Sequence, residues 1–384
     1  MSATPKSPPE ATPLQERLVQ LIRDHGPIRV GDYMTDALCH PQHGYYATRD
    51  PFGAPKDGQP GGDFTTAPEI SQLFGELVGA WLVHAWTEIG EPSAFNLIEL
   101  GPGRGTLMTD ILRVAKIRPA FLEAAKLFMV EASGRMRYAQ QRALREAYPD
   151  AAASATWADD LSDVPGGPTL LIANEFFDCL PIRQFVRTAE RTETPWRERL
   201  VGLNEDETGL AFVLGEEKHA DPGGLPRGAK PEDLFETCEP GQDLARQIAA
   251  RLGEAKGRAL IVDYGHGRSA VGDTFQAVRR HAHWPVLASP GEADVTAHVD
   301  FAALSRAARE AGARVDGPVR QADFLERLGI ERRLARVMEA AADDETREAL
   351  RSGALRLTEP GGMGGLFKVM AISSDGLGEP AGFS

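Results

Sequence analysis

The segment from Phe95 to Gly105 constrains the fold of this chain more than any other stretch. An apolar run that carries Glu99 comes first, and three glycines then alternate with Pro102 and Arg104. From Leu107 onward, apolar residues recur at helical spacing. This order predicts a strand, a tight glycine turn and a helix, the geometry with which α/β proteins bring backbone close to a nucleotide-like ligand.

The spacing of the glycines distinguishes between cofactors. A dinucleotide fingerprint reads Gly-x-Gly-x-x-Gly and directs a helix N-terminus at a pyrophosphate. Here Gly101, Gly103 and Gly105 bring the third glycine one residue early. Glu99 would repel a pyrophosphate, but it suits a cationic group such as the amino group or the sulfonium of S-adenosylmethionine. We therefore expect Glu99, the three glycines and Thr106 to bind S-adenosylmethionine, while a sharp strand-to-helix turn without a ligand stays open.

Composition narrows the class of protein. The 384 residues are 42% hydrophobic, enough for a sizeable core, and carry a net charge of -14, which argues against a general nucleic-acid surface. No apolar run approaches the ~20 residues that span a bilayer, so no membrane insertion is expected. His281 and His283 lack a third ligand, so we expect no metal site. Three cysteines lie far apart without a Cys-x-x-Cys pair and indicate a reducing compartment: Cys39, Cys179 and Cys238.

The chain divides into regions by composition and pattern. The start is rich in Pro, Ser, Thr and Ala and lacks the arginines of a mitochondrial presequence, so we expect a disordered tail and a cytoplasmic location. The expected regions are a tail (1–13), an N-terminal helical or lid region (14–90), a Rossmann-like cofactor domain (91–190 and 256–375) and a β-insertion with a helix (191–255). The expected fold class is therefore α/β, a doubly wound sheet with an added N-terminal helical region and a β-hairpin insertion.

The segment from Gly62 to Ser71 precedes the glycine turn and leads into a helix that runs to Leu82. Thr66 is a candidate N-cap, with Pro68 in the first turn and Glu69 three residues after the cap. A well-capped helix alone explains this pattern. Its position also suits a lid over the cofactor, with contacts from Asp63, Thr65 and Pro68.

Two further residues match the other parts of such a cofactor. Glu131 ends the second predicted strand, where an acid can accept hydrogen bonds from ribose hydroxyl groups. Trp157 follows a short third strand at the place where adenine would lie. Each has a plainer alternative, since Glu131 could cap the following helix and Trp157 could be an ordinary core residue.

The second informative stretch is Asn174-Glu175-Phe176-Phe177-Asp178, which follows a buried strand. In open α/β sheets the fourth strand ends beside the first, so these polar groups should face the cofactor of the glycine turn. Helix capping by Asn174 and Asp178 is the alternative. Guanidinium is always protonated, and two carboxylates can orient it through bidentate hydrogen bonds. We therefore consider an arginine acceptor held by Glu175 and Asp178, with His266 as a weaker candidate base.

Four motifs together resemble the MidA family: Gly62–Ser71, Glu99–Thr106, Asn174–Asp178 and Asp263-Tyr264-Gly265-His266. The resemblance runs from about Leu14 to Ile372 and is far more specific than any one motif. It implies a class I methyltransferase fold, S-adenosylmethionine as cofactor and symmetric dimethylation of a protein arginine. Mitochondrial members of that family act in the matrix as complex I assembly factors and methylate an arginine of the 49-kDa-type core subunit. Residues 56–60 form a small insertion relative to the family pattern.

Three functions remain in competition. The first is a protein-arginine methyltransferase acting on a respiratory complex I subunit or its bacterial equivalent. The second is an NAD-dependent oxidoreductase, against which the early third glycine and Glu99 count. The third is an assembly protein that retains the cofactor fold and performs little chemistry. The oligomeric state stays open, a homodimer included.

Overall fold

A computed structural model describes residues 11–49, 62–63, 65–189, 193–221, 224 and 228–384 of the chain. The chain forms two compact units. The unit that we call the sheet unit comprises residues 65–177, 242–267 and 303–384. The unit that we call the hairpin unit comprises residues 1–64, 178–241 and 268–302.

The sheet unit is built on one mixed sheet with the strand order β15-β16-β10-β5-β2-β3-β4. The strands β4, β3, β2, β5 and β10 pair in parallel, and β16 pairs antiparallel with both β10 and β15. The strand that directly follows β4 in the chain therefore lies beside β2, as the sequence predicts, and the doubly wound α/β class is confirmed. The bounds are β2 (Phe95–Leu100), β3 (Ala125–Val130), β4 (Thr156–Ala158), β5 (Thr169–Asn174), β10 (Gly257–His266), β15 (Arg314–Arg320) and β16 (Phe367–Ser373).

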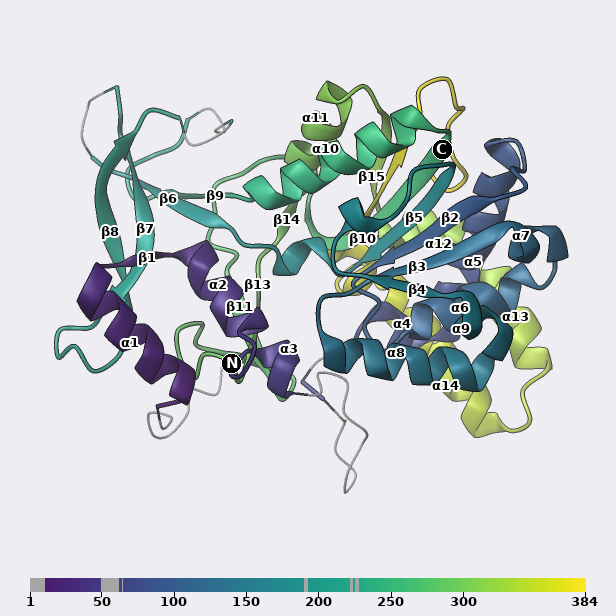
Figure 1. Ribbon diagram of the computed structural model, residues 1–384, viewed down its shortest axis with the longest axis horizontal. Coiled ribbons are helices and arrows are strands. Elements are labelled where there is room, and N and C mark those ends of the chain that lie inside the picture. The colour runs from purple at the N-terminus through teal and green to yellow at the C-terminus, as the bar shows by residue number, and fades with distance from the viewer. Residues whose placement is uncertain (1–10, 50–61, 64, 190–192, 222–223, 225–227) are drawn as a thin grey trace. The chain divides into compact units, whose positions relative to one another are not determined.

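Helices cover both faces of this sheet. All six residues of β2 and the first five of β5 are buried, as expected of strands covered on both sides. Figure 1 shows α10 (Glu239–Glu254) and α11 (Phe301–Glu310) along one face, while α6 (Thr106–Ala115) lies on the other. Further helices of the unit are α7 (Pro119–Ala124), α8 (Gly134–Ala147), α9 (Pro149–Ser154), α12 (Gln321–Arg327), α13 (Ile330–Glu339), α14 (Asp344–Thr358) and α15 (Met363–Leu366), with a 3₁₀ turn at Leu161–Asp163.

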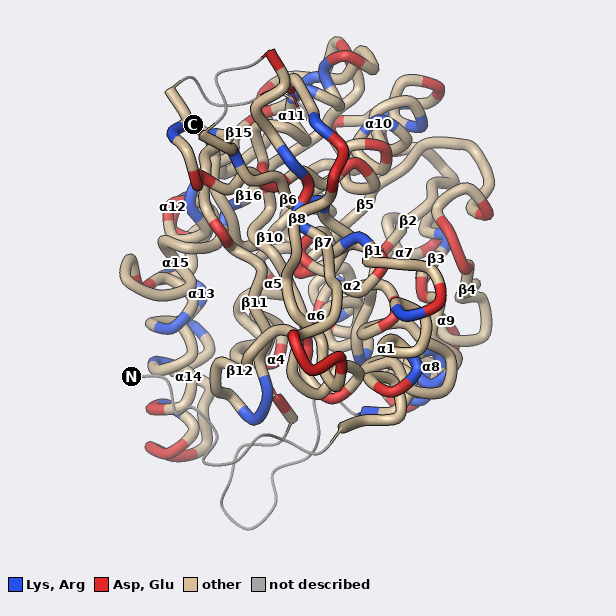
Figure 2. Tube along the Cα trace, turned by 90° about the vertical axis from the view of Figure 1, so that its left-hand side faces the viewer, with Lys and Arg blue, Asp and Glu red and all other residues tan. Residues whose placement is uncertain are grey.

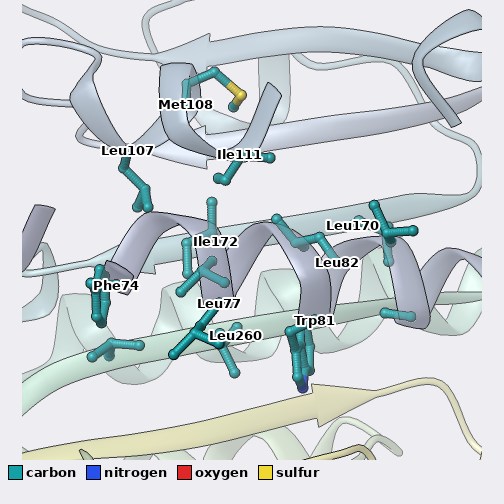
Figure 3. Packing of buried hydrophobic residues seen from close by; sticks show 14 of the residues in the cluster. Phe74, Leu77, Trp81, Leu82, Leu107, Met108, Ile111, Leu170, Ile172 and Leu260 are labelled. Carbon is teal, nitrogen blue, oxygen red and sulfur yellow. The ribbon is translucent and has the colours of Figure 1, made fainter. Parts of the chain in front are cut away.

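The main core of the sheet unit lies around α5 (Gln72–Glu88), which packs on α6 and on the sheet. Figure 3 shows Leu77 and Leu82 of α5 among side chains of both neighbours, with Leu107 on α6 and Ile172 on β5. Trp81 is 2% exposed, and its indole N–H donates to the Ala381 carbonyl at 3.0 Å. The helix is therefore a central element of the core.

The structure corrects the expected start of that helix. Thr66 precedes a separate short helix, α4 (Ala67–Ile70), and its side chain makes no capping hydrogen bond. Ser71 then adopts an extended conformation, with φ −159° and ψ 130°, and its hydroxyl accepts from the Leu73 N–H at 3.3 Å. Because a serine N-cap starts a new helix here, the Thr66 pattern describes only the first of two helices.

The hairpin unit has two small sheets and three helices in the described residues. In the larger sheet, β7 lies between β1 and β6, β6 also pairs with β9, and β8 pairs with β7. The expected β-insertion is thus present, with β8 running to His219 and β9 following it in the chain. The bounds are α1 (Pro13–His25), β1 (Ile28–Arg29), α2 (Val30–Cys39), α3 (Tyr45–Thr48), β6 (Arg183–Arg187), β7 (Trp196–Leu203), β8 (Leu210–His219), β9 (Leu234–Thr237), β11 (Gln276–Arg279), β12 (Ala282–Trp284), β13 (Asp294–Thr296) and β14 (Val299–Asp300), with a 3₁₀ turn at Phe177–Cys179.

The boundaries of the two compact units differ from those of the regions expected from the sequence. The helices of residues 14–90 divide between them: α1 and α2 pack in the core of the hairpin unit, and α5 packs in that of the sheet unit. Pro13, expected in the tail, is the first residue of α1, because the Thr12 hydroxyl caps this helix by accepting from the Gln15 N–H. Residues 1–10 and the expected insertion at residues 56–60 lie outside the described residues.

The C-terminal helices of the sheet unit carry charges of both signs, as Figure 2 shows along α13 and α14. Arg347 pairs with Asp344 at 2.7 Å on α14, so part of the charge there is locally balanced. The helices α13 and α14 are separated by a short link, residues 340–343. Asp343 ends the link between them, and its carboxylate caps α14 by accepting from the Thr346 N–H at 2.7 Å. No helix among the described residues has the length and hydropathy needed to cross a membrane.

Candidate functional site

The turn after β2 passes through three glycines in the left-handed backbone region. Their φ angles are +59° at Gly101, +54° at Gly103 and +85° at Gly105, a conformation that costs other residues roughly 1 kcal/mol. The Gly101 N–H donates to the Val130 carbonyl at 3.0 Å. A Cβ atom at position 101 would lie 2.6 Å from Cδ2 of Phe176. Backbone conformation and side-chain packing therefore both require glycine at this position.

Glu99 lies near the end of β2, just before this turn, and is 2% exposed. Its Oε2 atom is buried and makes no hydrogen bond with any residue that the structure describes. Burial raises the pKa of this carboxyl well above its usual range. Because an unpaired buried carboxylate is costly, a cationic ligand at this oxygen would stabilise the charged form.

Glu131 directly follows β3, and hydrogen bonds hold both oxygens of its carboxyl group. Oε1 accepts from the Ser133 N–H at 2.8 Å, and Oε2 accepts from Nε2 of Gln140 at 3.1 Å. Burial raises the pKa of Glu131, and these two hydrogen bonds act against that rise. The N-cap of α8 is Ser133, whose hydroxyl accepts from the Met136 N–H, so Glu131 is not itself the capping residue.

Trp157 lies in β4 and is partly buried. Its indole N–H donates to Oε1 of Gln140 at 2.8 Å. Gln140 is completely buried on α8 and is absent from the residues that sequence reasoning selects. One signal could have found it: the buried positions of α8 are Met136, Gln140 and Leu144, so a polar residue interrupts an apolar stripe with a spacing of four.

Hydrogen bonds attach the short helix α4 to the residue that follows β5 and to the first residue of α6. The Ala67 N–H donates to Oε1 of Glu175 at 2.9 Å, and the hydroxyl of Thr106 donates to Oε1 of Glu69 at 2.6 Å. The Thr106 hydroxyl therefore binds α4, and Glu69 is a second residue that sequence reasoning did not select. Of the three cofactor contacts expected from the segment Gly62–Ser71, Thr65 precedes α4 and Pro68 lies in its first turn.

The end of β5 carries Asn174 and Glu175. The Asn174 side-chain amide donates to Oε1 of Glu175 at 3.2 Å, and its own Oδ1 is buried with no hydrogen-bond partner among the described residues. Glu175 has a φ of +51°, which is uncommon for a residue other than glycine. Its N–H donates to the Val262 carbonyl of β10 at 2.9 Å. Strained backbone of this kind is often found at functional sites.

A fully buried carboxylate, Asp263 of β10, shapes the turn after β5. Its Oδ2 accepts from the N–H groups of Phe176 and Phe177 at 3.2 and 3.0 Å, and its Oδ1 accepts from the Tyr264 N–H at 2.9 Å. The role of this acid is to hold backbone. His266 is the last residue of the same strand.

Two of the selected acids belong to the hairpin unit. Asp63 accepts from the Tyr45 hydroxyl at 2.9 Å and from the Arg280 N–H at 2.7 Å, and its carbonyl accepts from the His281 N–H at 2.9 Å. It thereby holds the turn between β11 and β12, where φ is +52° at Arg280 and +59° at His281. Asp178 is buried, and its carbonyl accepts from the Ala297 N–H.

The site residues that the sequence predicts in the sheet unit lie at one edge of its sheet, together with α4. Parallel strands direct their carboxyl ends to the same edge, which is where open α/β sheets bind ligands. The residues at or near these ends are Glu99, the three glycines and Thr106 (β2), Glu131 (β3), Trp157 (β4), Asn174 and Glu175 (β5) and His266 (β10). The unpaired Glu99 oxygen, the left-handed glycine turn, the acid after β3 and the indole in β4 fit the cationic, ribose and adenine parts of S-adenosylmethionine.

Comparison with known proteins agrees with this chemistry. Residues 77–319 match the family described as "Putative S-adenosyl-L-methionine-dependent methyltransferase". The chain is 35% identical over 382 residues to the mitochondrial protein arginine methyltransferase NDUFAF7 of Mus musculus, covering 94% of this chain and 85% of that protein. It is 35% identical over 385 residues to the protein of the same name from Homo sapiens, covering 94% and 83%.

A solved structure is also similar over nearly the whole chain. It is a methyl transferase candidate from Burkholderia thailandensis, crystallised with S-adenosyl-homocysteine. The TM-score is 0.81 at 27% sequence identity, with 98% of this chain and 97% of that chain covered. The similarity therefore includes both compact units, and it comes from a protein that binds the demethylated form of the expected cofactor.

Proposed function

We propose, since the chain belongs to the S-adenosyl-L-methionine-dependent methyltransferase family, that it transfers a methyl group to an arginine side chain of a protein. The relatives named protein arginine methyltransferases support the acceptor, because they align over most of both chains. The observation in this chain that supports the cofactor part of the proposal is the buried Oε2 of Glu99, which lacks a partner among the described residues and lies beside a left-handed glycine turn.

The chemistry required of the protein is mainly positioning. Bound S-adenosyl-L-methionine supplies an electrophilic methyl group on a positively charged sulfur. The acceptor nitrogen of a guanidinium is a poor nucleophile, because the group stays protonated and its charge is delocalised. Carboxylates that bind the other nitrogens localise this charge and align the acceptor nitrogen for in-line attack. A base must also take one proton from that nitrogen.

We assign the orienting role to Glu175 and Asp178, and His266 is the weaker candidate for the general base. The contacts of Glu175 support its part, because Oε1 is fixed by the Ala67 N–H and by Asn174, so the carboxylate has a defined direction. The neighbouring Asn174 Oδ1 is a buried acceptor without a described partner and suits an N–H of the substrate. Asp178 follows three residues later along the chain, and we include it for its charge.

The acceptor protein is the finer part of the proposal. The MidA resemblance supports a core subunit of respiratory complex I, of the 49-kDa type, or its bacterial equivalent, with symmetric dimethylation as the product. A bacterial member would act in the cytoplasm. An assembly protein without catalysis is the competing function, and it predicts cofactor binding without methylation of the subunit.

The test incubates the purified chain with S-adenosyl-L-methionine and the candidate subunit, followed by intact-mass measurement and peptide mapping. We expect a mass increase of one or two methyl groups on a single arginine. With Glu175→Gln, the amide oxygen still accepts from the Ala67 N–H, so S-adenosyl-homocysteine should bind as before. Methyl transfer should fall at least roughly tenfold, because the orienting charge is lost.

Glu326→Gln, an exposed substitution on α12, is the matched control and should methylate at the wild-type rate. Full methyl transfer by Glu175→Gln would refute the role of Glu175. Cofactor binding without any mass shift on any complex I subunit would favour the assembly function instead.

A further inference from the structure

Gln140 connects three parts of the sheet unit that belong to the candidate cofactor site. Its Nε2 donates to the Gly103 carbonyl in the glycine turn at 2.9 Å and to Oε2 of Glu131 at 3.1 Å. Its Oε1 accepts from the indole N–H of Trp157 at 2.8 Å. One buried amide thus contacts the turn after β2, the acid after β3 and the aromatic residue in β4.

The chemistry of the partners fixes the direction of this amide. The indole N–H of Trp157 can only donate, so it must face the amide oxygen. The Gly103 carbonyl and the ionised carboxylate of Glu131 can only accept hydrogen bonds, so both must face the amide nitrogen. Exchanging the two amide ends would break all three hydrogen bonds. Gln140 therefore has one orientation that satisfies its partners, and it uses both of its N–H groups.

The helix that carries Gln140 makes a second link between the same strand ends. Arg137 lies one turn earlier on α8, where i and i+3 positions share a face. Its Nε donates to the Glu131 carbonyl, and its Nη2 pairs with Asp159, which follows β4. Gln140 is 0% exposed, while the side chain of Asp159 is 77% exposed, so the buried link is the stronger one.

We propose that Gln140 is a positioning residue for the cofactor, which holds the glycine turn, the ribose-binding acid and the adenine-side aromatic in one mutual geometry. This inference rests on the proposed cofactor but not on the identity of the methyl acceptor. Gln140 orients the carboxylate of Glu131 from one side, while the Ser133 N–H fixes its other oxygen. It also occupies the N–H of Trp157, so that residue meets the cofactor through its ring. Cofactor affinity therefore depends on a residue that need not touch the cofactor.

The inference also predicts that loss of Gln140 changes the pH dependence of cofactor affinity. Burial raises the pKa of Glu131, and the hydrogen bond from Gln140 is one of the contacts that oppose this rise. Removing that bond should raise the pKa of Glu131 further. An ionised carboxylate accepts ribose hydroxyls better than a protonated one, so affinity falls as pH drops through this pKa. Without Gln140 the fall should begin at a higher pH.

The primary experiment measures S-adenosyl-homocysteine binding by calorimetry across a pH series for the wild type and Gln140→Met. Methionine has a similar length and none of the three hydrogen bonds. We expect the Kd of the variant to rise roughly ten- to a hundredfold, because three buried polar groups lose their partner. We also expect the pH midpoint, at which affinity falls on acidification, to move upward. Gln141→Met, the same substitution one position along α8, is the control and should retain wild-type affinity and midpoint.

A second variant keeps the test decisive if Gln140→Met does not fold. Gln140→Glu preserves the acceptor for Trp157 but places a carboxylate against Glu131 and the Gly103 carbonyl. It should bind S-adenosyl-homocysteine weakly in mildly alkaline solution. It should regain affinity in mildly acidic solution, where the two acids can share a proton.

The outcomes separate this inference from the proposed function. If a folded Gln140 variant binds with the wild-type Kd and the wild-type pH midpoint, Gln140 has only a structural role and the inference is wrong. If the wild type itself does not bind S-adenosyl-homocysteine, the cofactor assignment fails first. If the variants lose affinity as expected while no arginine is methylated, the positioning role stands and the acceptor assignment fails.

Discussion

The strands β2 and β10 each carry a buried carboxylate, and the two differ in their hydrogen bonds. Asp263 on β10 accepts hydrogen bonds from three backbone N–H groups, all within the turn that follows β5 or on its own strand. Glu99 on β2 is as deeply buried, yet its Oε2 has no hydrogen-bond partner among the described residues. Both acids lie in the same sheet, two strands apart. Asp263 shapes the backbone around it, whereas Glu99 is the acid that we propose binds the cationic part of the cofactor.

The largest effect should come from Asp263→Asn. The amide nitrogen would face backbone N–H groups that now donate to a carboxylate oxygen. Because hydrogen bonds to a charged acceptor are lost in a buried place, the free energy of unfolding should fall by about 3 kcal/mol. Urea unfolding of the apoprotein measures this loss. A variant as stable as the wild type would remove the distinction between the two acids.

The same chemical change at the other strand end should have the opposite result. Glu99→Gln replaces a carboxylate that has no described partner at Oε2, so the free energy of unfolding should change by less than about 1 kcal/mol. The affinity for S-adenosyl-L-methionine should fall by about 2 kcal/mol, or roughly thirtyfold in Kd, because a charge-assisted contact is lost. Calorimetric titration checks this. An unchanged Kd would show that Glu99 does not bind the cation.

The smallest effect concerns the pH dependence of apoprotein stability. Burial raises the pKa of Glu99 in the folded state, so the folded chain binds this proton more tightly than the unfolded chain does. The stability that this proton contributes is fully present below the pKa of Glu99 in the unfolded chain. It is lost as pH rises through the pKa of Glu99 in the folded chain. The wild type should therefore lose stability over this window relative to Glu99→Gln. Unfolding measured at several pH values gives the difference between the two proteins, and parallel profiles would contradict the assignment.

The local order of the fold could be predicted from the sequence. The strand, glycine turn and helix of residues 95–115 follow from short-range patterns, because apolar runs and glycine spacing act within a few residues. The rule for parallel sheets also places β5 beside β2 correctly. The break at Ser71 could not be predicted, since Thr66 and Pro68 already satisfy the pattern of a helix start. Its extended backbone lies against Gly353, whose added Cβ would be 3.0 Å from the Ser71 Cβ.

For the candidate site, the sequence predicts which residues lie near strand ends but not the contacts that connect them. Glu99 lies near the end of β2 and Glu131 directly follows β3, so both are visible as acids near strand ends. The partners of Gln140 come from three different segments, and only the packing of α8 brings them to one amide. The role of Asp263 likewise depends on the parallel register that sets Val262 opposite Asn174. Tertiary contacts of this kind leave no local pattern.

The contact between Gly101 and Phe176 has a consequence for how this protein can evolve. The ring of Phe176 fills the space that a side chain at position 101 would need. A substitution at Gly101 is therefore accessible only after Phe176 has become smaller, and even then the left-handed backbone disfavours it. The order of the two steps is fixed by geometry: the aromatic can vary first, and the glycine cannot. Among descendants of this sequence, variation at position 176 should precede any at position 101.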